Sequence, residues 1–218
     1  MIHYALIFAI VSYLLGSIPF GYLLVRAFRG EDVRRTGSGN IGATNVARTG
    51  SKWLALATLL LDGLKGYIAV AHVFFWARHY PAEVPRGGSH TVFAFAAFAG
   101  FCAIVGHMFP IWLRFKGGKG VATAVGSFLG IAPAAVGVAL LLFGIIVAFT
   151  RYVSLGSILG AAIFPIAACW LEPRARSAGV LGFMVASSLL IVIRHKDNIR
   201  RLLAGNESRF GEKKADSA

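Results

Sequence analysis

Residues 121–150 read VATAVGSFLGIAPAAVGVALLLFGIIVAFT and contain no charged side chain. A transmembrane helix needs about 20 apolar residues, so these thirty are long for a single span. Pro133 interrupts the run after Ile131 and Ala132, because proline disrupts the interior of a helix. We therefore expect two short spans in this stretch, or one span and a re-entrant half.

Apolar segments also fill most of the remaining chain. Of its 218 residues 57% are hydrophobic, and the mean hydropathy is +0.70. This composition is typical of a polytopic membrane protein and excludes a soluble domain. We predict an all-α fold in one transmembrane domain, residues 1–218, with seven spans and a disordered tail after about residue 211. Outside the central stretch the spans are expected at residues 2–25, 53–77, 91–113, 153–171 and 177–193.

The positive charge lies in the short segments between these spans. A net charge of +13 would suit nucleic acid, but at span ends it indicates membrane orientation and sites for anionic ligands instead. Seven spans put Arg78, Arg86, Arg174 and Arg176 on one side. The other side then holds Arg26, Arg29, Arg34, Arg35, Arg48, Lys52, Arg114, Lys116, Lys119, Arg151 and the tail. The positive-inside rule places the N-terminus outside and the C-terminus in the cytoplasm. Six spans would move Arg151 and the basic tail away from the basic side.

A glycine- and lysine-rich loop, residues 115–123 (FKGGKGVAT), separates two apolar segments. Glycines let the backbone turn tightly and approach a ligand, and the lysines supply point charges. Val121 and Ala122 begin a new apolar segment, so the loop leads into a helix N-terminus, which suits a phosphate. The loop is not a P-loop, because Gly120 follows Lys119 where a hydroxyl for magnesium is required. A flexible basic turn that only fixes orientation is the alternative.

Two further polar segments fall on the same side. Residues 37–48 (GSGNIGATNVAR) combine glycines and uncharged polar groups with Arg48, which can clamp a phosphate with paired hydrogen bonds. Their G-x-G-x-x-G pattern follows a membrane span, not a strand, so a dinucleotide site is rejected. The alternative is a turn with helix caps at Thr44 or Asn45. In residues 194–207, helical spacing puts His195, Asn198, Ile199 and Leu202 on one face, where a histidine is either functional or structural.

Among the expected spans, only the one at residues 53–77 contains charged side chains. Asp62 and Lys65 are three residues apart, hence on one helical face, and a structural ion pair is the favoured interpretation. Cys102 and Cys169 lie in apolar segments and are expected to be small core residues, not a disulfide. No metal-ligand spacing is present.

Taken together and in this order, the segments resemble one family, the bacterial acyl-phosphate–glycerol-3-phosphate acyltransferases. The matching stretches are residues 16–21, 37–48, 106–110 leading into 116–123, and 194–209. Asp62 and Lys65 also sit where the family places such a pair. Each motif alone is modest, but the ordered set covers nearly the whole chain and is specific.

The resemblance implies a seven-span enzyme of the bacterial inner membrane with its active site facing the cytoplasm. It would transfer a fatty acyl group from acyl phosphate to the 1-hydroxyl of glycerol 3-phosphate, giving lysophosphatidic acid and phosphate. This would be the first acylation of phospholipid synthesis. The expected partners are these two substrates and membrane lipid, without nucleic acid, metal or cofactor, and a monomer is compatible with this. The rival is a membrane transporter or channel for anionic phosphorylated solutes, although the polar motifs lie at one surface, not near the midplane.

The resemblance also implies the site residues. His195, Ser38, Asn198 and Arg48 are the catalytic candidates. Phosphate and substrate binding is assigned to Lys116, Gly117, Gly118, Lys119, Gly120, Thr123, Asn40, Thr44, Asn45 and Glu207. Arg48 and the lysines would neutralise charge, and Ser38 and Asn198 would orient substrate. Either His195 or a substrate phosphate oxygen would take the proton.

Overall fold

The computed structural model describes residues 2–84 and 88–211, and this part of the chain is helical with no β-strand. The main helices are α1 (Ile2–Ser17), α2 (Phe20–Arg29), α4 (Lys52–His79), α5 (Ser89–Met108), α6 (Val121–Leu129), α7 (Pro133–Thr150), α8 (Val153–Leu171), α9 (Ala178–Arg194) and α10 (Lys196–Leu203). Shorter elements are α3 (Ala43–Ala47) and the 3₁₀ turns η1 (Val33–Arg35), η2 (Pro81–Glu83), η3 (Ile111–Leu113) and η4 (Pro173–Arg176). Arg86 and the tail beyond residue 211, for which we expected disorder, lie outside the described residues.

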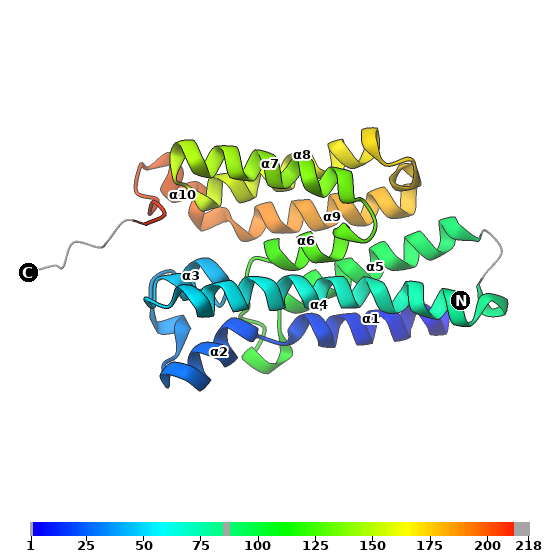
Figure 1. The fold of residues 1–218 in the computed structure, drawn as a ribbon, viewed down its shortest axis with the longest axis horizontal. Helices are drawn as coiled ribbons and strands as arrows, with labels where there is room; N and C mark the ends of the chain where they lie inside the picture. Colours follow the sequence, from blue (N-terminus) through cyan, green and yellow to red (C-terminus); the bar gives the residue numbers. More distant parts are fainter. Residues whose placement is uncertain (1, 85–87, 212–218) are drawn as a thin grey trace, which may run out of the picture.

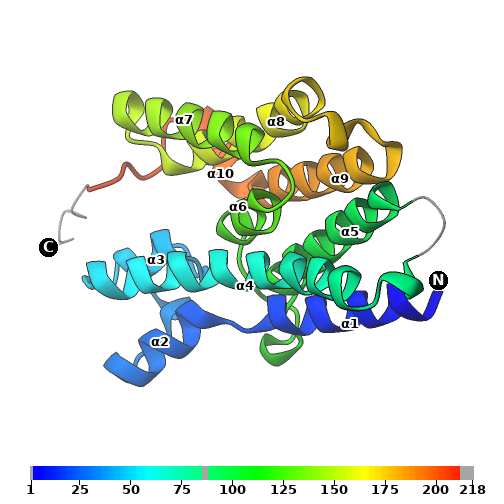
Figure 2. The same cartoon turned by 45° about the vertical axis from the view of Figure 1, so that its right-hand side comes forward.

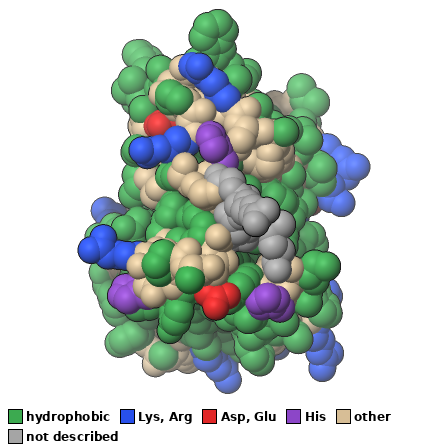
Figure 3. Space-filling model, turned by 90° about the vertical axis from the view of Figure 1, so that its right-hand side faces the viewer, with side chains coloured by type: hydrophobic (Ala, Val, Ile, Leu, Met, Phe, Trp, Pro, Cys, Tyr) green, Lys and Arg blue, Asp and Glu red, His purple; other side chains and the backbone are tan. Residues whose placement is uncertain are grey.

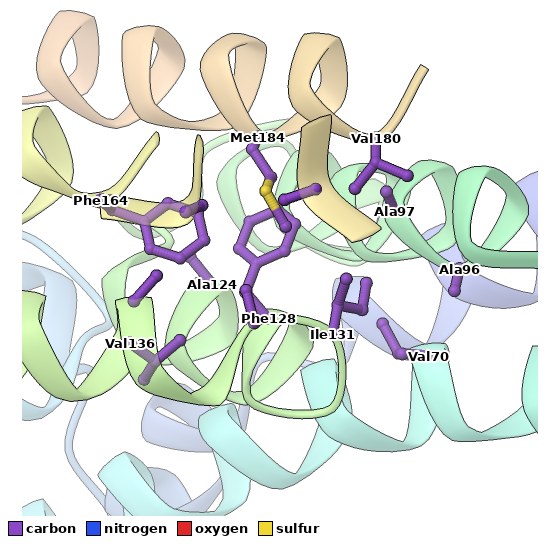
Figure 4. Packing of buried hydrophobic residues seen from close by; sticks show 14 of the residues in the cluster. Val70, Ala96, Ala97, Ala124, Phe128, Ile131, Val136, Phe164, Val180 and Met184 are labelled. Atoms are coloured by element: carbon purple, nitrogen blue, oxygen red, sulfur yellow. The ribbon is translucent and has the colours of Figure 1, made fainter. Parts of the chain in front are cut away.

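The helices form two layers with α6 between them. Helices α1, α4 and α5 pack on one side, and α7, α8 and α9 pack on the other (Figures 1 and 2). Contacts of α5 with α9 and of α6 with α4, α5 and α7 join the layers. Phe128 of α6, Phe164 of α8 and Met184 of α9 meet in the core (Figure 4), where the two phenyl centroids are 5.0 Å apart. This apolar contact fixes α6 inside the bundle.

Several expected spans differ from the observed helices. The segment expected at residues 2–25 is divided between Ser17 and Phe20 into α1 and α2, because Pro19 cannot continue the helix. The segment expected to reach residue 113 ends its α-helix at Met108 and continues as the turn η3. Across the described residues, five helical stretches are long and apolar enough to cross a membrane. A sixth is obtained if α9 and α10, bent by 54°, count as one span.

The break expected near Pro133 is confirmed, since α6 ends at Leu129 and Pro133 begins α7. Helix α6 has nine residues, about 14 Å of helix, so it cannot cross a bilayer alone. It packs closely on α4, where a Cβ on Gly126 would collide with the backbone of Gly63. A Cβ on Gly66 would likewise collide with the Thr123 carbonyl. Small residues thus let α6 enter the bundle beside α4.

The two ends of the bundle differ in their surface. The N-terminal end of α1 lies opposite α10 along the long axis (Figure 1). Figure 3 looks onto the end where α1 begins, and its surface is mostly hydrophobic with scattered basic side chains. The polar motifs lie toward the other end, where α2, α3 and α10 are found (Figure 1).

Candidate active site

Asn45 organises the first polar segment. Its side-chain Nδ2 donates toward the carbonyls of Val33, Thr36 and Asn40 at 2.8–2.9 Å. Its Oδ1 accepts from the N–H of Ser38 at 2.8 Å and from the Ser38 hydroxyl at 3.2 Å. The Asn45 side chain is 2% exposed, and both of its polar atoms form hydrogen bonds within residues 33–45. These hydrogen bonds hold the loop in shape, and substrate binding by Asn45 stays a prediction.

Of the other predicted residues of this segment, one bonds within the loop and three are exposed on its surface. Asn40 accepts the N–H of Gly42 at 2.9 Å and so shapes the turn before α3. Ser38, Thr44 and Arg48 are exposed and available to a ligand. The Arg48 side chain runs alongside Gly37, whose φ of 57° is the left-handed conformation that glycine tolerates. The segment thus presents a hydroxyl and a guanidinium on a rigid turn.

The glycine–lysine loop is fastened to the end of α5. The N–H groups of Gly117 and Gly118 donate to the carbonyls of Met108 and His107, both at 3.1 Å. Arg194, the last residue of α9, donates from Nη2 to the carbonyls of the same two glycines at 3.2 and 3.3 Å. Because these carbonyls face Arg194 and the N–H groups face α5, the loop is held from two helices.

The loop and the C-terminal segment meet through three predicted residues. Lys119 Nζ donates to Asn198 Oδ1 at 2.5 Å, and Asn198 Nδ2 donates to Glu207 Oε1 at 2.6 Å. Glu207 also accepts from the Ser154 hydroxyl and from Arg201 Nε, each at 2.7 Å. His195, just before α10, and Asn198 are buried, and Lys196, Asp197 and Arg200 are exposed, as predicted. Ile199 and Leu202 are half-buried, and so is Arg201, which was predicted to lie off this face.

Lys119 lies at the centre of the basic groups. Burial lowers the pKa of Lys119 to about 8, the carboxylate of Glu207 opposes this shift, and Arg201, Arg48 and Arg194 add to it. These charges come from α3, α9, α10 and the C-terminal segment, so the structure brings the three predicted segments together around one ammonium group. Three guanidinium groups and one ammonium against one carboxylate leave an excess of positive charge, which is suited to an anion.

His195 follows the last residue of α9 and is buried at 2% exposure. Its Nδ1 lies 2.8 Å from the Ile191 carbonyl, which can only accept, so Nδ1 carries the hydrogen and Nε2 keeps the lone pair. Burial, and then the charge of Lys119, lowers the pKa of His195 to about 4. The imidazole is therefore neutral at physiological pH.

The two lysines of the loop point to different places. Lys116 is exposed and lines an open hollow of about 470 Å³ together with Asp32, Arg34, Arg35, Gly39, Phe115, Gly117 and Arg194. Lys119 instead reaches Asn198. Gly120 adopts φ of 80° and caps α6, as expected for a loop leading into a helix N-terminus. Thr123, predicted to bind phosphate, is fully buried in the first turn of α6.

No role was predicted for Arg194, which bonds the glycine loop, or for Arg201 and Ser154, which bond Glu207. Arg194 and Arg201 lie in the segment that we singled out, but helical spacing alone did not bring Arg201 to Glu207. Ser154 is 53 residues from Glu207 along the chain, and no local pattern marks it. The predicted Asp62–Lys65 ion pair is present, with Lys65 Nζ 2.7 Å from Asp62 Oδ1.

Comparison with known proteins gives one consistent result. A family model described as glycerol-3-phosphate acyltransferase matches residues 6–205. The glycerol-3-phosphate acyltransferase of Mesorhizobium japonicum is 49% identical over 215 residues, covering 96% of this chain and 98% of the relative. That of Sinorhizobium fredii is 47% identical over 203 residues, covering 93% and 90%.

Two solved structures are also similar. One is the glycerol 3-phosphate form of PlsY (YgiH), described as an integral membrane glycerol 3-phosphate acyltransferase, with a TM-score of 0.80 and 36% identity. It covers 95% of this chain and 96% of that one. The other is the lysophosphatidic acid form of the same protein, with a TM-score of 0.78 and 35% identity. It covers 95% of both chains.

Proposed function

The chain belongs to the glycerol-3-phosphate acyltransferase family, and we propose that it acylates the 1-hydroxyl of glycerol 3-phosphate with acyl phosphate as donor. The observation that carries this proposal is the meeting of the glycine–lysine loop with the C-terminal segment, where Lys119 bonds Asn198 and Arg194 bonds the carbonyls of the loop glycines. Both substrates bear phosphate, and such a group of cations can neutralise two head groups. The products are lysophosphatidic acid and inorganic phosphate.

The reaction needs placement more than covalent catalysis. The hydroxyl oxygen of glycerol 3-phosphate attacks the acyl carbonyl carbon, a new ester bond forms, and the bond from that carbon to the phosphate oxygen breaks. Phosphate leaves with the electron pair of the broken bond. The donor is already activated, so an acyl-enzyme is unnecessary. Ser38 donates its hydroxyl hydrogen to the Asn45 amide, which is no base, so Ser38 orients substrate instead of attacking it.

The remaining roles follow from the contacts. Lys119 and Arg48 hold phosphate and stabilise the developing negative charge. Asn198 aligns Lys119 with Glu207 through its two amide atoms. Because burial makes His195 a weak base, a phosphate oxygen of a substrate accepts the hydroxyl proton and His195 orients the acceptor.

The proposal includes the membrane arrangement. In the seven-pass arrangement α6 and the glycine–lysine loop before it together count as one pass, so α1 begins and α10 ends on opposite sides, with the basic segments in the cytoplasm. The active site then faces the cytoplasm across the bacterial inner membrane, and the acyl tail lies among the spans. Helix α6 supports this count because it is a separate helix between α5 and α7, both along the chain and in the bundle (Figure 2).

The test uses purified protein in detergent or lipid mesophase with glycerol 3-phosphate and palmitoyl phosphate, without added metal. We expect phosphate and lysophosphatidic acid in equal amounts, and no product from palmitoyl-CoA. Phosphate release without lysophosphatidic acid would make the protein a hydrolase. Binding of both substrates without turnover would favour a transporter. The Lys119→Ala variant should raise the KM of at least one substrate, and unchanged KM values for both would refute its role as a clamp.

A further inference from the structure

Three ionisable side chains outside the basic group around Lys119 are buried together between α4 and α5. Asp62, Lys65 and His107 are each 3% exposed. The Asp62 Oδ1 atom lies 2.7 Å from Lys65 Nζ and 3.5 Å from His107 Nδ1. Burying charged groups is costly even when they are paired, and an apolar core of equal volume is often as stable. Stability alone therefore does not explain the cluster, and its contacts with neighbouring segments indicate its role.

His107 forms the floor under the glycine–lysine loop. The His107 carbonyl accepts the N–H of Gly118 at 3.1 Å. The imidazole ring lies directly against the same glycine, since a Cβ on Gly118 would overlap His107 Nε2. The position of this ring therefore limits how far Gly118, and with it Lys119, can move toward α5.

Lys65 connects the cluster to the other phosphate-binding segment. Its Nζ donates to the Ile18 carbonyl at 2.7 Å and lies 5.7 Å from the centroid of the Phe20 ring. Ile18 sits at the break between α1 and α2, and α2 leads directly to residues 37–48. One buried cluster thus contacts the glycine loop on one side and the base of the first polar segment on the other.

We propose that Asp62, Lys65 and His107 are positioning residues that fix the glycine–lysine loop relative to the α1–α2 break. The cluster sets the distance between Lys119 and Arg48, the groups that neutralise phosphate. Asp62 holds both of its partners, Lys65 reaches the break, and His107 supports Gly118. This inference rests on the proposed function only for its kinetic readout.

The first test compares His107→Leu with His72→Leu. His72 is a matched control on α4, because its ring packs against Phe8 of α1, with centroids 5.3 Å apart, and does not pair with Asp62 as His107 does. Small misplacements of binding groups have large kinetic effects, so His107→Leu should raise the KM of a phosphate substrate about tenfold, with kcat changed less than about threefold. His72→Leu should leave both values near wild type. A purely structural role would instead reduce the folded fraction without changing KM.

Conservative replacement provides the rescue. His107→Gln keeps a polar side chain long enough to reach the Nε2 position against Gly118, and should recover most of the lost affinity. Single removal of Asp62 or Lys65 leaves a buried unpaired charge and can prevent folding. The double variant Asp62→Leu with Lys65→Met removes both charges at similar volume, so it should fold and still show the raised KM. Wild-type KM values in a folded double variant, or equal effects of His72→Leu and His107→Leu, would overturn the proposal.

A second readout is independent of catalysis. Amide hydrogen exchange of residues 116–120 should be about tenfold faster in His107→Leu than in wild type or His72→Leu, because the loop loses its floor. Unchanged exchange in this segment would overturn the positioning role. If the wild-type protein showed no acyl transfer but the exchange difference appeared, the proposed function would fail while the positioning role held.

Discussion

At the scale of single residues, Lys119 determines what the site can bind. Its ammonium group is half-buried among Arg48, Arg194 and Arg201, a cost that Glu207 and Asn198 only partly offset. An anion entering the site relieves this repulsion, so the positive charges favour phosphate even before any specific contact. Lys116 also has basic neighbours, because Arg34, Arg35 and Arg194 line the same hollow, but it is exposed, so solvent screens its charge.

The lowered pKa of Lys119 predicts a pH-dependent affinity. Its value is about 8, so the ammonium is charged below that pH and loses its proton above it. Between pH 7 and pH 9 the charged fraction falls by about tenfold, and kcat/KM for a phosphate substrate should fall accordingly. Lys119→Arg is the matched control, because a guanidinium stays charged throughout and its profile should be flat. A flat profile for the wild-type protein would refute the assigned charge.

A substitution of His195 distinguishes the two possible proton acceptors, the imidazole and a phosphate oxygen of a substrate. In His195→Gln the amide keeps a polar group near the Nε2 position but cannot act as a base. Because His195 is neutral and weakly basic, we expect kcat within about tenfold of wild type and an unchanged pH profile from pH 6 to 9. A loss of about a thousandfold or more would instead identify His195 as the proton acceptor.

At the scale of elements, the first polar segment depends on Asn45 for its shape. Residues 33–45 form a turn around one buried amide, whose hydrogen bonds span up to 12 residues of chain. The site therefore consists of rigid loops that present Ser38, Arg48 and Lys119, not of flexible basic turns. The Asn45 amide, which was predicted to bind substrate, holds in place the turn that carries Ser38 and Arg48.

Replacing Asn45 by Asp tests this. A carboxylate cannot donate to the carbonyls of Val33, Thr36 and Asn40 and would face them with like partial charge, so the segment should lose about 2–4 kcal/mol. We expect faster proteolysis and hydrogen exchange within residues 33–48 and a large loss of activity. The control is Asn40→Asp, because the Asn40 side chain only accepts from Gly42 and a carboxylate can do the same. Equal effects of the two substitutions would contradict this role of Asn45.

The elements also show which features the sequence could predict. Proline and periodicity act locally, so the break before Pro133 and the buried face of His195 and Asn198 were predicted correctly. Partners far apart in the chain leave no local pattern, as with Ser154 and Glu207, and Lys116 and Lys119 look equivalent until the fold separates them. The first expected span is one apolar stretch, Ile2–Arg29, but Pro19 divides its helix, and the short α6 fits the expected alternative of one span and a re-entrant half.

At the scale of the whole molecule, the short helix α6 is what allows a polar loop to enter an apolar bundle. A full span after the loop would begin at the surface, but nine residues packed beside Gly63 and Gly66 of α4 begin deeper. The loop consequently reaches the buried cluster of Asp62 and His107, which would otherwise face only apolar neighbours. In the proposed arrangement, substrate phosphates from the cytoplasm and an acyl chain from the bilayer would meet at this loop.

The seven-pass arrangement predicts that residues at the two ends of the bundle are on opposite sides of the membrane. In a background with Cys102→Ser and Cys169→Ser, single cysteines at the exposed positions Ala82 and Ser208 report the two ends. A membrane-impermeant maleimide added to intact spheroplasts should label Ala82→Cys, while Ser208→Cys should react only after the membrane is opened. If α6 did not count as a pass, six spans would bring both chain ends to the outside. The maleimide would then label both Ala82→Cys and Ser208→Cys in intact spheroplasts. Labelling of Ser208→Cys from outside would therefore overturn both the count and the cytoplasmic site, because Glu207 lies beside it in the chain and bonds directly to Asn198.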